Sequence, residues 1–526
     1  MGWLVAPAGV AAGSEGVGRG GLWVRRRCRG SAPGPAPQTP AGGGVPGGGA
    51  GGAGGVACAA AGTESLVGVV TDTGPGVAIV GMLAAMPQPP SAASRDEPVI
   101  RERGDACPGA LRLHAADDGF LARVRLPGGL LTVRQAEALA LAADRFGDGH
   151  LELTSRGNVQ LRGLADGCGA GLAELLDGAG LLPAPSHERV RNIVATPMSG
   201  LDGPDGPDGP RDPARPDALA WAMEFDRLLC ASPWAAALSG RFLFAFDDGR
   251  GDVASLGPDV TVLGRPEGRA LVRLGRAADA VELAGRDTPR AALSAARYFL
   301  DAVAAAGTQA WRVSELPAEH ALETAEFVRR LGAAGIAATP AGAPRRPYAA
   351  PPRPGRSAGH DGRATLCVLP PLGRLGSAQW RVLVRVADED GSGRLRVTPW
   401  RSVVLPSVGG NGAGRIEDAG LVLAPDSPWQ SVTACTGRPG CAKSRADVRA
   451  DARAVADLAR GPLPVHWSGC ERRCGHPRGT AWVDLVATGS GYRLAAPGRP
   501  VRDDVRPSEL AAALADARTD PDVVKK

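Results

Sequence analysis

The residues best suited to chemistry are four cysteines late in the chain. Five residues separate Cys435 from Cys441, and three separate Cys470 from Cys474. Two close cysteine pairs on separate loops can bring four thiolates to one point, which is how proteins hold a [4Fe–4S] cluster. We therefore predict a [4Fe–4S] cluster with these four cysteines as its ligands.

Two other states of these cysteines compete with a cluster. Zinc sites usually place about two to four residues between paired ligands, so the loop 436–440 is long for zinc, and its glycines let backbone N–H groups approach cluster sulfurs. Unliganded or disulfide-paired cysteines are the second alternative. Helix formers follow Cys441 as far as Gly461, which predicts a helix that begins at Cys441 and favours its thiolate.

Composition excludes several classes of protein. The chain has 526 residues and a formal charge of +5, but only Lys443, Lys525 and Lys526 are lysines. We attribute this arginine bias to a GC-rich genome rather than to nucleic-acid binding. Ten cysteines are too few for a secreted disulfide scaffold, which favours a reducing, cytoplasmic setting. No apolar run reaches the roughly 18 residues of a membrane span.

The first part of the chain differs in composition from the rest. Residues 1–95 are mostly Gly, Ala, Pro and Val, and such a segment lacks the large apolar side chains that offset chain entropy. We predict a disordered low-complexity extension there. Because of this composition we also expect the natural start to be Met82 or Met86.

A strand–helix–strand unit occurs twice. Alternating residues predict a strand over 119–127, a capped amphipathic pattern predicts a helix over 132–147, and a second strand follows from Leu151. The segment from Gly129 to Thr154 matches the segment from Gly373 to Thr398 without a gap. We infer two α+β halves related by pseudo-symmetry, of which only the second holds the cysteines.

In the first half, polar side chains take the place of the cysteines. Arg156, Asn158 and Gln160 alternate along a strand, and Arg191 and Asn192 follow a later loop. Because a guanidinium binds carboxylates through two parallel hydrogen bonds, these residues suit a polycarboxylate or oxyanion ligand. The alternative is that the arginines are strand ends paired with Asp or Glu. For Arg156 and Arg191 together we favour ligand contact.

These motifs together resemble the nitrite and sulfite reductase superfamily over residues 103–496. The resemblance includes Arg156, Arg191, the segment 238–242 and the four cysteines. Within the superfamily, the segments 103–109, 190–202 and 246–252 resemble the precorrin-3B synthase family. Asp247, Asp248 and Asp252 in the last segment could bind a metal, but an Asp-Asp-Gly turn explains them more simply.

The resemblance implies an α+β class and a duplicated nitrite/sulfite reductase-like fold. Two ferredoxin-like half-domains and two α/β cluster-type domains would surround a central cleft. The implied divisions are a half-domain over 103–164, an α/β domain without a cluster over 165–343, a linker over 344–360, a second half-domain over 361–408, a [4Fe–4S]-binding α/β domain over 409–500 and a tail over 501–526.

The resemblance also implies a reaction. It is the oxygen-dependent conversion of precorrin-3A to precorrin-3B, in which C20 is hydroxylated and the ring A acetate forms a lactone. A [4Fe–4S] cluster and a mononuclear non-haem iron would assist, and Arg156, Asn158, Gln160, Arg191, Asn192 and Arg241 would bind the tetrapyrrole. His466 and His476 are the candidate iron ligands, although a structural role is the simpler reading for each.

Three departures from the superfamily pattern affect this interpretation. Sulfite reductases place two lysines on one strand to bind sulfite, where this chain has Arg241 and Leu243, so sirohaem and sulfite chemistry is the second reading. Arg473 replaces the glycine that usually precedes the last cysteine, which predicts backbone strain if that position has a positive φ. No Gly-x-Gly-x-x-Gly fingerprint follows a strand, so electrons would come from a separate reductase or ferredoxin. A non-catalytic electron carrier or tetrapyrrole-binding protein is the third reading.

Overall fold

The structure is a computed structural model, and it describes residue 105 and residues 107–201, 216–342, 350–359, 361–477 and 481–518. The predicted disordered extension over 1–95, with the two candidate start residues Met82 and Met86, lies outside these residues.

The first half-domain is built on a five-stranded antiparallel sheet whose strands follow the order β1-β2-β5-β4-β14. The helix α1 (Val133–Phe146) covers it, and it begins where predicted because the Thr132 hydroxyl accepts the N–H of Gln135 while the Gln135 side chain accepts the N–H of Thr132. The strands are β1 (His114–Ala116), β2 (Gly119–Val124), β4 (His150–Leu153), β5 (Val159–Leu164) and β14 (Arg374–Gly376).

The second half-domain repeats this sheet in the order β12-β13-β16-β15-β3. The halves exchange their edge strands: β14 comes from the second half of the sequence but pairs with β4, and β3 comes from the first half but pairs with β15. The duplication predicted from sequence is confirmed. The strands are β3 (Leu130–Thr132), β12 (Gly355–Ala358), β13 (Ala364–Val368), β15 (Arg394–Val397) and β16 (Val403–Val408).

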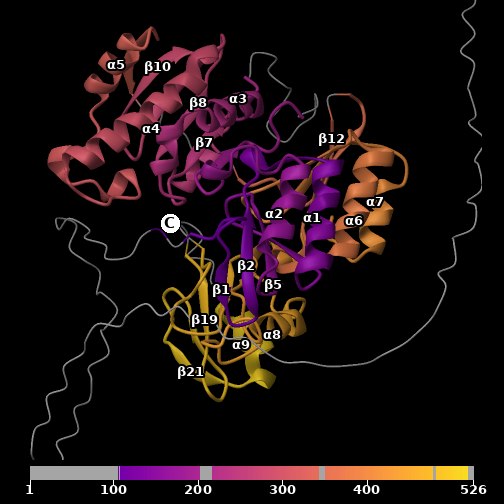
Figure 1. The fold of residues 1–526 in the computed structure, drawn as a ribbon. Helices are drawn as coiled ribbons and strands as arrows, with labels where there is room; N and C mark the ends of the chain where they lie inside the picture. Colours follow the sequence, from indigo (N-terminus) through magenta and orange to yellow (C-terminus); the bar gives the residue numbers. More distant parts are fainter. Residues whose placement is uncertain are drawn as a thin grey trace, which may run out of the picture. The chain divides into compact units, whose positions relative to one another are not determined.

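Four helices lie side by side over the two half-domains (Figure 1). α1 packs between α2 (Gly169–Gly178) and α6 (Ser377–Arg385), and α7 (Gly412–Asp418) follows α6. The Trp380 indole N–H donates to the Ala136 carbonyl across the α1–α6 contact at 2.8 Å. All four helices bury apolar residues in one core shared by both half-domains. The half-domains therefore extend past the predicted ends at 164 and 408, and β12 occupies part of the predicted linker.

The domain without cysteine motifs contains a six-stranded sheet, and three helices pack against its buried strands. Strands β6, β7 and β8 are parallel, and the other three are antiparallel to their neighbours. Of the helices, α4 is the longest, with 18 residues, and α5 has 10. The elements are β6 (Ile193–Ala195), β7 (Phe244–Asp247), β8 (Val260–Gly264), β9 (Arg269–Leu274), β10 (Asp279–Ala284), β11 (Ala338–Gly342), α3 (Ala218–Cys230), α4 (Thr288–Ala305) and α5 (Thr324–Ala333).

The cysteine domain has a five-stranded sheet of the same kind, with three parallel strands followed by antiparallel ones. Residues 501–518 belong to this domain rather than to a tail, because Leu510 and Leu514 fill its core and the buried Arg518 donates to the Leu463 and Gly461 carbonyls. The elements are β17 (Val432–Ala434), β18 (Val465–Ser468), β19 (Val483–Ala487), β20 (Tyr492–Ala495), β21 (Arg502–Val505), α8 (Val448–Val455) and α9 (Leu510–Ala517).

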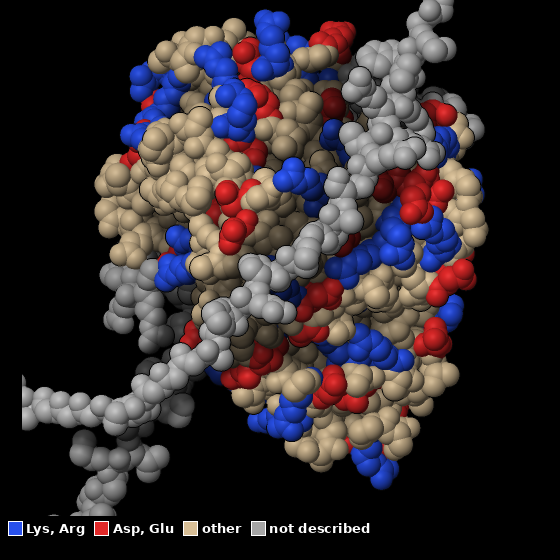
Figure 2. Space-filling model, turned by 45° about the vertical axis from the view of Figure 1, so that its right-hand side comes forward, with Lys and Arg blue, Asp and Glu red and all other residues tan. Residues whose placement is uncertain are grey.

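Charges of both signs are interspersed on the face shown in Figure 2. That face has no broad basic field of the kind that draws nucleic acid to a protein. Among the described residues, no helix is both long and apolar enough to cross a membrane.

The acidic turn after β7 is confirmed as a turn. The Asp247 carboxylate accepts the backbone N–H groups of Gly249, Gly251 and Ala254. Asp252 accepts the Thr196 hydroxyl at 2.8 Å, while its second oxygen is buried without a hydrogen-bond partner. Burial, followed by repulsion from Asp247, raises the pKa of Asp252 to about 8.

This raised pKa predicts a pH-dependent stability. The folded chain keeps a proton on Asp252 that the unfolded chain releases above a pKa of 3.8, so the contribution of Asp252 to stability falls as pH rises from about 4 to about 8. Across this range we expect the free energy of unfolding of the wild type to fall by at least about 1 kcal/mol more than that of Asp252→Asn. Urea unfolding at several pH values measures the effect, and parallel curves for the two proteins would contradict it.

Candidate functional site

The two cysteine loops leave the same end of the cysteine-domain sheet. Cys435 directly follows β17 and Cys470 lies two residues after β18, and these neighbouring strands are parallel. The Cys435 N–H donates to the Trp467 carbonyl at 2.9 Å, and the Gly469 N–H donates to the Cys435 sulfur at 3.2 Å. The sheet therefore brings the two predicted ligand loops together.

The other two predicted ligands, Cys441 and Cys474, lie on these same loops. The Arg445 N–H donates to the Gly469 carbonyl at 2.9 Å, which ties the segment after Cys441 to the turn before Cys470. Burial raises the pKa of Cys435, N–H donors oppose this, and the nearby thiols of Cys474 and Cys470 raise it further. Cys474 is exposed, and the other three cysteines are half-buried.

The donor set of these cysteines is compatible with a four-iron cluster. Every cysteine in the part of the chain that the structure describes is free, which removes the disulfide reading there. No group of three or more His, Cys, Asp and Glu side chains among the described residues could hold a single metal ion. In a four-iron cluster each sulfur binds a different iron atom, so the cysteines lie farther apart than around one ion. Four free thiols on two joined loops, with an N–H donor to one sulfur, match that donor set.

One local prediction about the loops is wrong and another is confirmed. The expected helix does not begin at Cys441, because residues 441–447 form turns and α8 begins at Val448 with Asp447 as its cap. Cys441 therefore lies seven residues before the helix and gains no stabilisation from its dipole. Arg473 has a φ of 46°, as its position before Cys474 predicted. Its ion pair with Asp484, at 2.6 Å, helps to hold this strained turn, which costs roughly 1 kcal/mol.

The two histidines lie beside the second loop and contact the same tryptophan. His466 is fully buried, its Nδ1 pairs with the Thr433 hydroxyl at 2.8 Å, and its Nε2 has no hydrogen-bond partner among the described residues. Burial, followed by Arg401, lowers the pKa of His466 to about 3. His476 stacks on Trp482, and the ring of His466 meets Trp482 edge-on. An iron ion held by the two histidines remains a prediction.

A second site is formed by three arginines of the first half-domain. Arg123 lies on β2, Arg125 directly follows it, and Arg156 lies in the turn between β4 and β5. The Arg125 and Arg156 guanidiniums both donate to the Gly240 carbonyl at 3.3 Å. We call Arg123, Arg125 and Arg156 the arginine cluster.

No carboxylate among the described residues contacts the arginine cluster, and Glu152, Glu188 and Asp259 act on it only from a distance. None of its three members forms an ion pair with a carboxylate within the described ranges, and the Nε atoms of Arg123 and Arg125 are buried without partners. Burial, followed by repulsion from Arg123 and Arg156, lowers the pKa of Arg125 to about 9, and burial, followed by Arg312, lowers that of Arg156 to about 10. Because cations buried together repel one another, this site favours an anionic ligand.

Three of the predicted binding residues hold the arginine cluster in place. Gln160 accepts from Arg123 at 2.8 Å, and Asn192 accepts from Arg125 at 3.4 Å. The Asn158 side-chain oxygen accepts the Leu126 N–H at 2.9 Å, and the buried Asn158 NH₂ group has no hydrogen-bond partner in the part of the chain that the structure describes. These amides therefore orient cations and backbone, and Asn158 has a donor to spare.

The structure argues against a binding role for Arg191. Its guanidinium forms two 2.8 Å hydrogen bonds to Asp226 and one of 3.1 Å to the Leu181 carbonyl, all of them buried. This is the structural alternative, an arginine paired with an acid, and it leaves little capacity for a ligand. Arg241 lies over the Trp311 ring at 4.8 Å. Because its side chain is exposed, it remains accessible to a ligand.

Arg123 and Arg125 belong to the site but were not among the predicted binding residues, although the sequence contained a signal for them. They are two residues apart in the predicted strand 119–127, so their side chains lie on the same face. A pair of arginines on one face of a largely buried strand indicates a site rather than a solvated edge.

Comparisons with known proteins agree with this architecture. A family model described as the nitrite/sulfite reductase ferredoxin-like half domain matches residues 113–176 and 357–419. The chain is 26% identical to a precorrin-3B synthase from Sinorhizobium sp over 416 residues, which cover 76% of this chain and 84% of that protein. It is 27% identical to a ferredoxin–nitrite reductase from Synechococcus elongatus over 406 residues, covering 68% and 74%. The solved structure of Mycobacterium tuberculosis NirA protein superposes with a TM-score of 0.56 at 17% identity, covering 75% of this chain and 79% of that one.

Proposed function

We propose that this chain, which has the duplicated fold of the nitrite and sulfite reductases, is an iron–sulfur oxygenase that converts precorrin-3A to precorrin-3B. The observation that carries the proposal is the arginine cluster, in which the buried Arg125 and the half-buried Arg123 and Arg156 have no carboxylate in contact among the described residues. Similarity to a precorrin-3B synthase along most of that protein's length supports this reaction.

Each part of the site has a role in this proposal. Arg123, Arg125 and Arg156 bind carboxylates at the edge of the tetrapyrrole, because a guanidinium recognises a carboxylate through paired hydrogen bonds. The Asn158 NH₂ group can donate to the same ligand, and Arg241 offers a further cation. Bulky, precisely oriented substrates need such fixed anchors so that one carbon faces the oxidant.

The four cysteines supply the redox part of the proposal. Cys435, Cys441, Cys470 and Cys474 hold the [4Fe–4S] cluster, which when bound passes electrons singly from an external reductase or ferredoxin. Hydroxylation of C20 by dioxygen requires two electrons and two protons. One oxygen atom then adds to C20 and the other leaves as water. The double bond between C20 and the neighbouring ring carbon is consumed, because the ring A acetate adds its carboxyl oxygen to that carbon to form the lactone while the carboxyl proton is transferred to the oxygen on C20.

A sirohaem-dependent nitrite or sulfite reductase is the second candidate. Its support is the similarity to the Synechococcus elongatus nitrite reductase, because the same arginines could bind the carboxylates of sirohaem instead of a substrate. Leu243 argues against sulfite reduction: it is a buried apolar residue that packs with Val194 and Ala245. This position therefore contributes no second cation beside Arg241.

Anaerobic purification separates these candidates. We expect iron and acid-labile sulfide near four of each per chain, no haem absorption, and oxygen uptake that depends on both precorrin-3A and a reductant. Haem-coloured protein that reduces nitrite or sulfite with reduced ferredoxin would contradict the oxygenase proposal. Binding of precorrin-3A without oxygen uptake would instead favour a non-catalytic carrier.

A further inference from the structure

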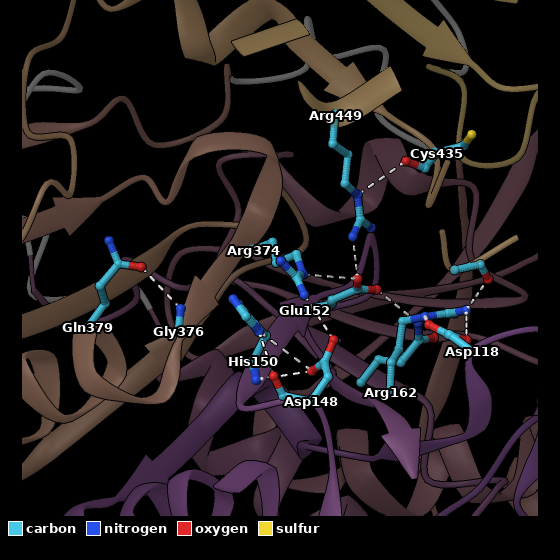
Figure 3. Close-up of polar contacts among 12 residues, drawn as sticks. Asp118, Asp148, His150, Glu152, Arg162, Arg374, Gly376, Gln379, Cys435 and Arg449 are labelled. Carbon is cyan, nitrogen blue, oxygen red and sulfur yellow. Dashed lines mark hydrogen bonds and ion pairs between the residues drawn. The ribbon is translucent and has the colours of Figure 1, made fainter. Parts of the chain in front are cut away.

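Glu152 on β4 is a buried acid at which three parts of the fold meet. It is 9% exposed. Gln160 reaches it from β5 of its own sheet, Arg374 from β14 of the second half of the sequence, and Arg449 from α8 of the cysteine domain. Figure 3 shows Arg449 and Arg374 converging on its carboxylate. Glu152 is thus one contact point between the half-domains and the cysteine domain.

The two oxygens of Glu152 point to different sites. Oε1 accepts from Arg449 at 2.6 Å, and the Nε–H of Arg449 donates to the Cys435 carbonyl at 3.2 Å (Figure 3). Oε2 accepts from the Gln160 amide at 3.0 Å, and the other end of that amide accepts from Arg123 at 2.8 Å. An unbroken series of hydrogen bonds therefore joins a predicted cluster ligand to the arginine cluster.

The charge on Glu152 holds this series together. Burial alone would raise the pKa of Glu152, but Arg449, Arg162 and Arg374 together lower it below the usual value. The ionised carboxylate accepts on both sides, and a neutral amide in its place would offer only one accepting oxygen. Changing Glu152 to glutamine therefore weakens one link or the other without changing side-chain size.

A neighbouring ion pair provides a matched comparison. Arg162 on β5 forms a bidentate pair with Asp118 at 2.7 and 2.9 Å, and it also donates to the Gly440 carbonyl in the first cysteine loop. This pair, too, joins the first half-domain to the cysteine loop. The described hydrogen bonds of Arg162 include neither Glu152 nor the arginine cluster, although its charge acts on Glu152, so the pair anchors the loop without being a link in the hydrogen-bond series.

We propose that Glu152 is a positioning residue that couples anion binding at the arginine cluster to the reduction potential of the cluster held by Cys435. An anionic ligand competes with Gln160 for the donors of Arg123. The freed amide then changes its hydrogen bond to Glu152. Glu152 in turn changes its hydrogen bond to Arg449, which donates to the Cys435 carbonyl. The inference rests on the proposed function, since it requires both an iron–sulfur cluster and an anionic ligand. Linkage requires the effect to be mutual, so cluster reduction changes ligand affinity by the same factor.

The test is a redox titration of the purified holoprotein with and without saturating uroporphyrin, an unreactive tetrapyrrole polycarboxylate. In the wild type we expect uroporphyrin to shift the midpoint potential, and its Kd to differ about fivefold or more between oxidised and reduced protein. In Glu152→Gln we expect most of that shift to disappear while iron content and probe binding remain. In Asp118→Asn we expect uroporphyrin still to shift the midpoint potential, even though the lost charge changes the midpoint potential measured without uroporphyrin.

A second variant keeps the test decisive if Glu152→Gln does not fold. Gln160→Met removes the amide link but leaves the Glu152–Arg449 pair intact, and it should abolish the shift equally. A shift of wild-type size in either variant, or no shift in a wild type that binds both iron and probe, would overturn the coupling. A wild type without iron, or one that ignores uroporphyrin, would overturn the proposed function and this inference with it.

Discussion

Serine in place of Cys470 is expected to reduce the iron content from about four atoms per chain to near zero. A serine hydroxyl is a far weaker iron ligand than a thiolate, and Cys470 lies in the turn whose Gly469 contacts both the Cys435 sulfur and Arg445. Loss of one ligand therefore removes the centre that joins the two loops, and oxygen uptake should stop. Iron and sulfide analysis, with visible absorbance, measures the loss.

Cys168→Ser is the control for this prediction. Cys168 is also half-buried and free, but it precedes α2 on the first half-domain and packs against the half-domain core. Its serine variant should keep full iron content. Iron retained in Cys470→Ser, or lost equally in both variants, would show that Cys470 is not a ligand.

The fold could be predicted from sequence because its signals are local and repeated. Thr132 and Gln135 form the cap that their spacing indicated, and Gly129–Thr154 and Gly373–Thr398 each place a helix over an antiparallel sheet. The exchange of β3 and β14 between sheets could not be predicted this way, since each strand is only three residues long. The same holds for α2 and α7, whose role in the shared core depends on packing rather than on local pattern.

The site was harder to predict because partners lie far apart in sequence. Nothing near Arg191 indicates that Asp226 neutralises it, so a paired arginine and a free one look alike in sequence. Glu152 resembles an ordinary strand residue until Arg374 and Arg449 reach it from other parts of the fold. The cluster ligands could be proposed from sequence because cysteine spacing alone restricts the kind of ligand, and the cluster stays a prediction. Charges, in contrast, gain meaning only from their neighbours.

Arg156→Ala is expected to weaken tetrapyrrole binding roughly ten- to a hundredfold, which corresponds to the loss of one charge-assisted interaction of about 1.5–3 kcal/mol. The folded protein should not lose stability to a similar extent. Within the described residues the Arg156 guanidinium makes one long hydrogen bond, to the Gly240 carbonyl, and burial, followed by repulsion from Arg312, lowers its pKa to about 10. Its removal relieves repulsion in the unliganded protein, as is common where a site sacrifices stability for function. Uroporphyrin titration and urea unfolding measure the two effects.

Arg145→Ala provides the matched comparison, because Arg145 is an exposed arginine near the end of α1 that lies over the Phe146 ring. It removes the same charge from the same half-domain, so a general loss of positive potential would weaken binding equally in both variants. Binding weakened only in Arg156→Ala, with cluster absorbance and stability preserved, assigns the effect to direct contact. Unchanged binding in Arg156→Ala would remove Arg156 from the site. A large loss of stability would mean instead that its buried charge is already satisfied within the fold, as that of Arg191 is by Asp226.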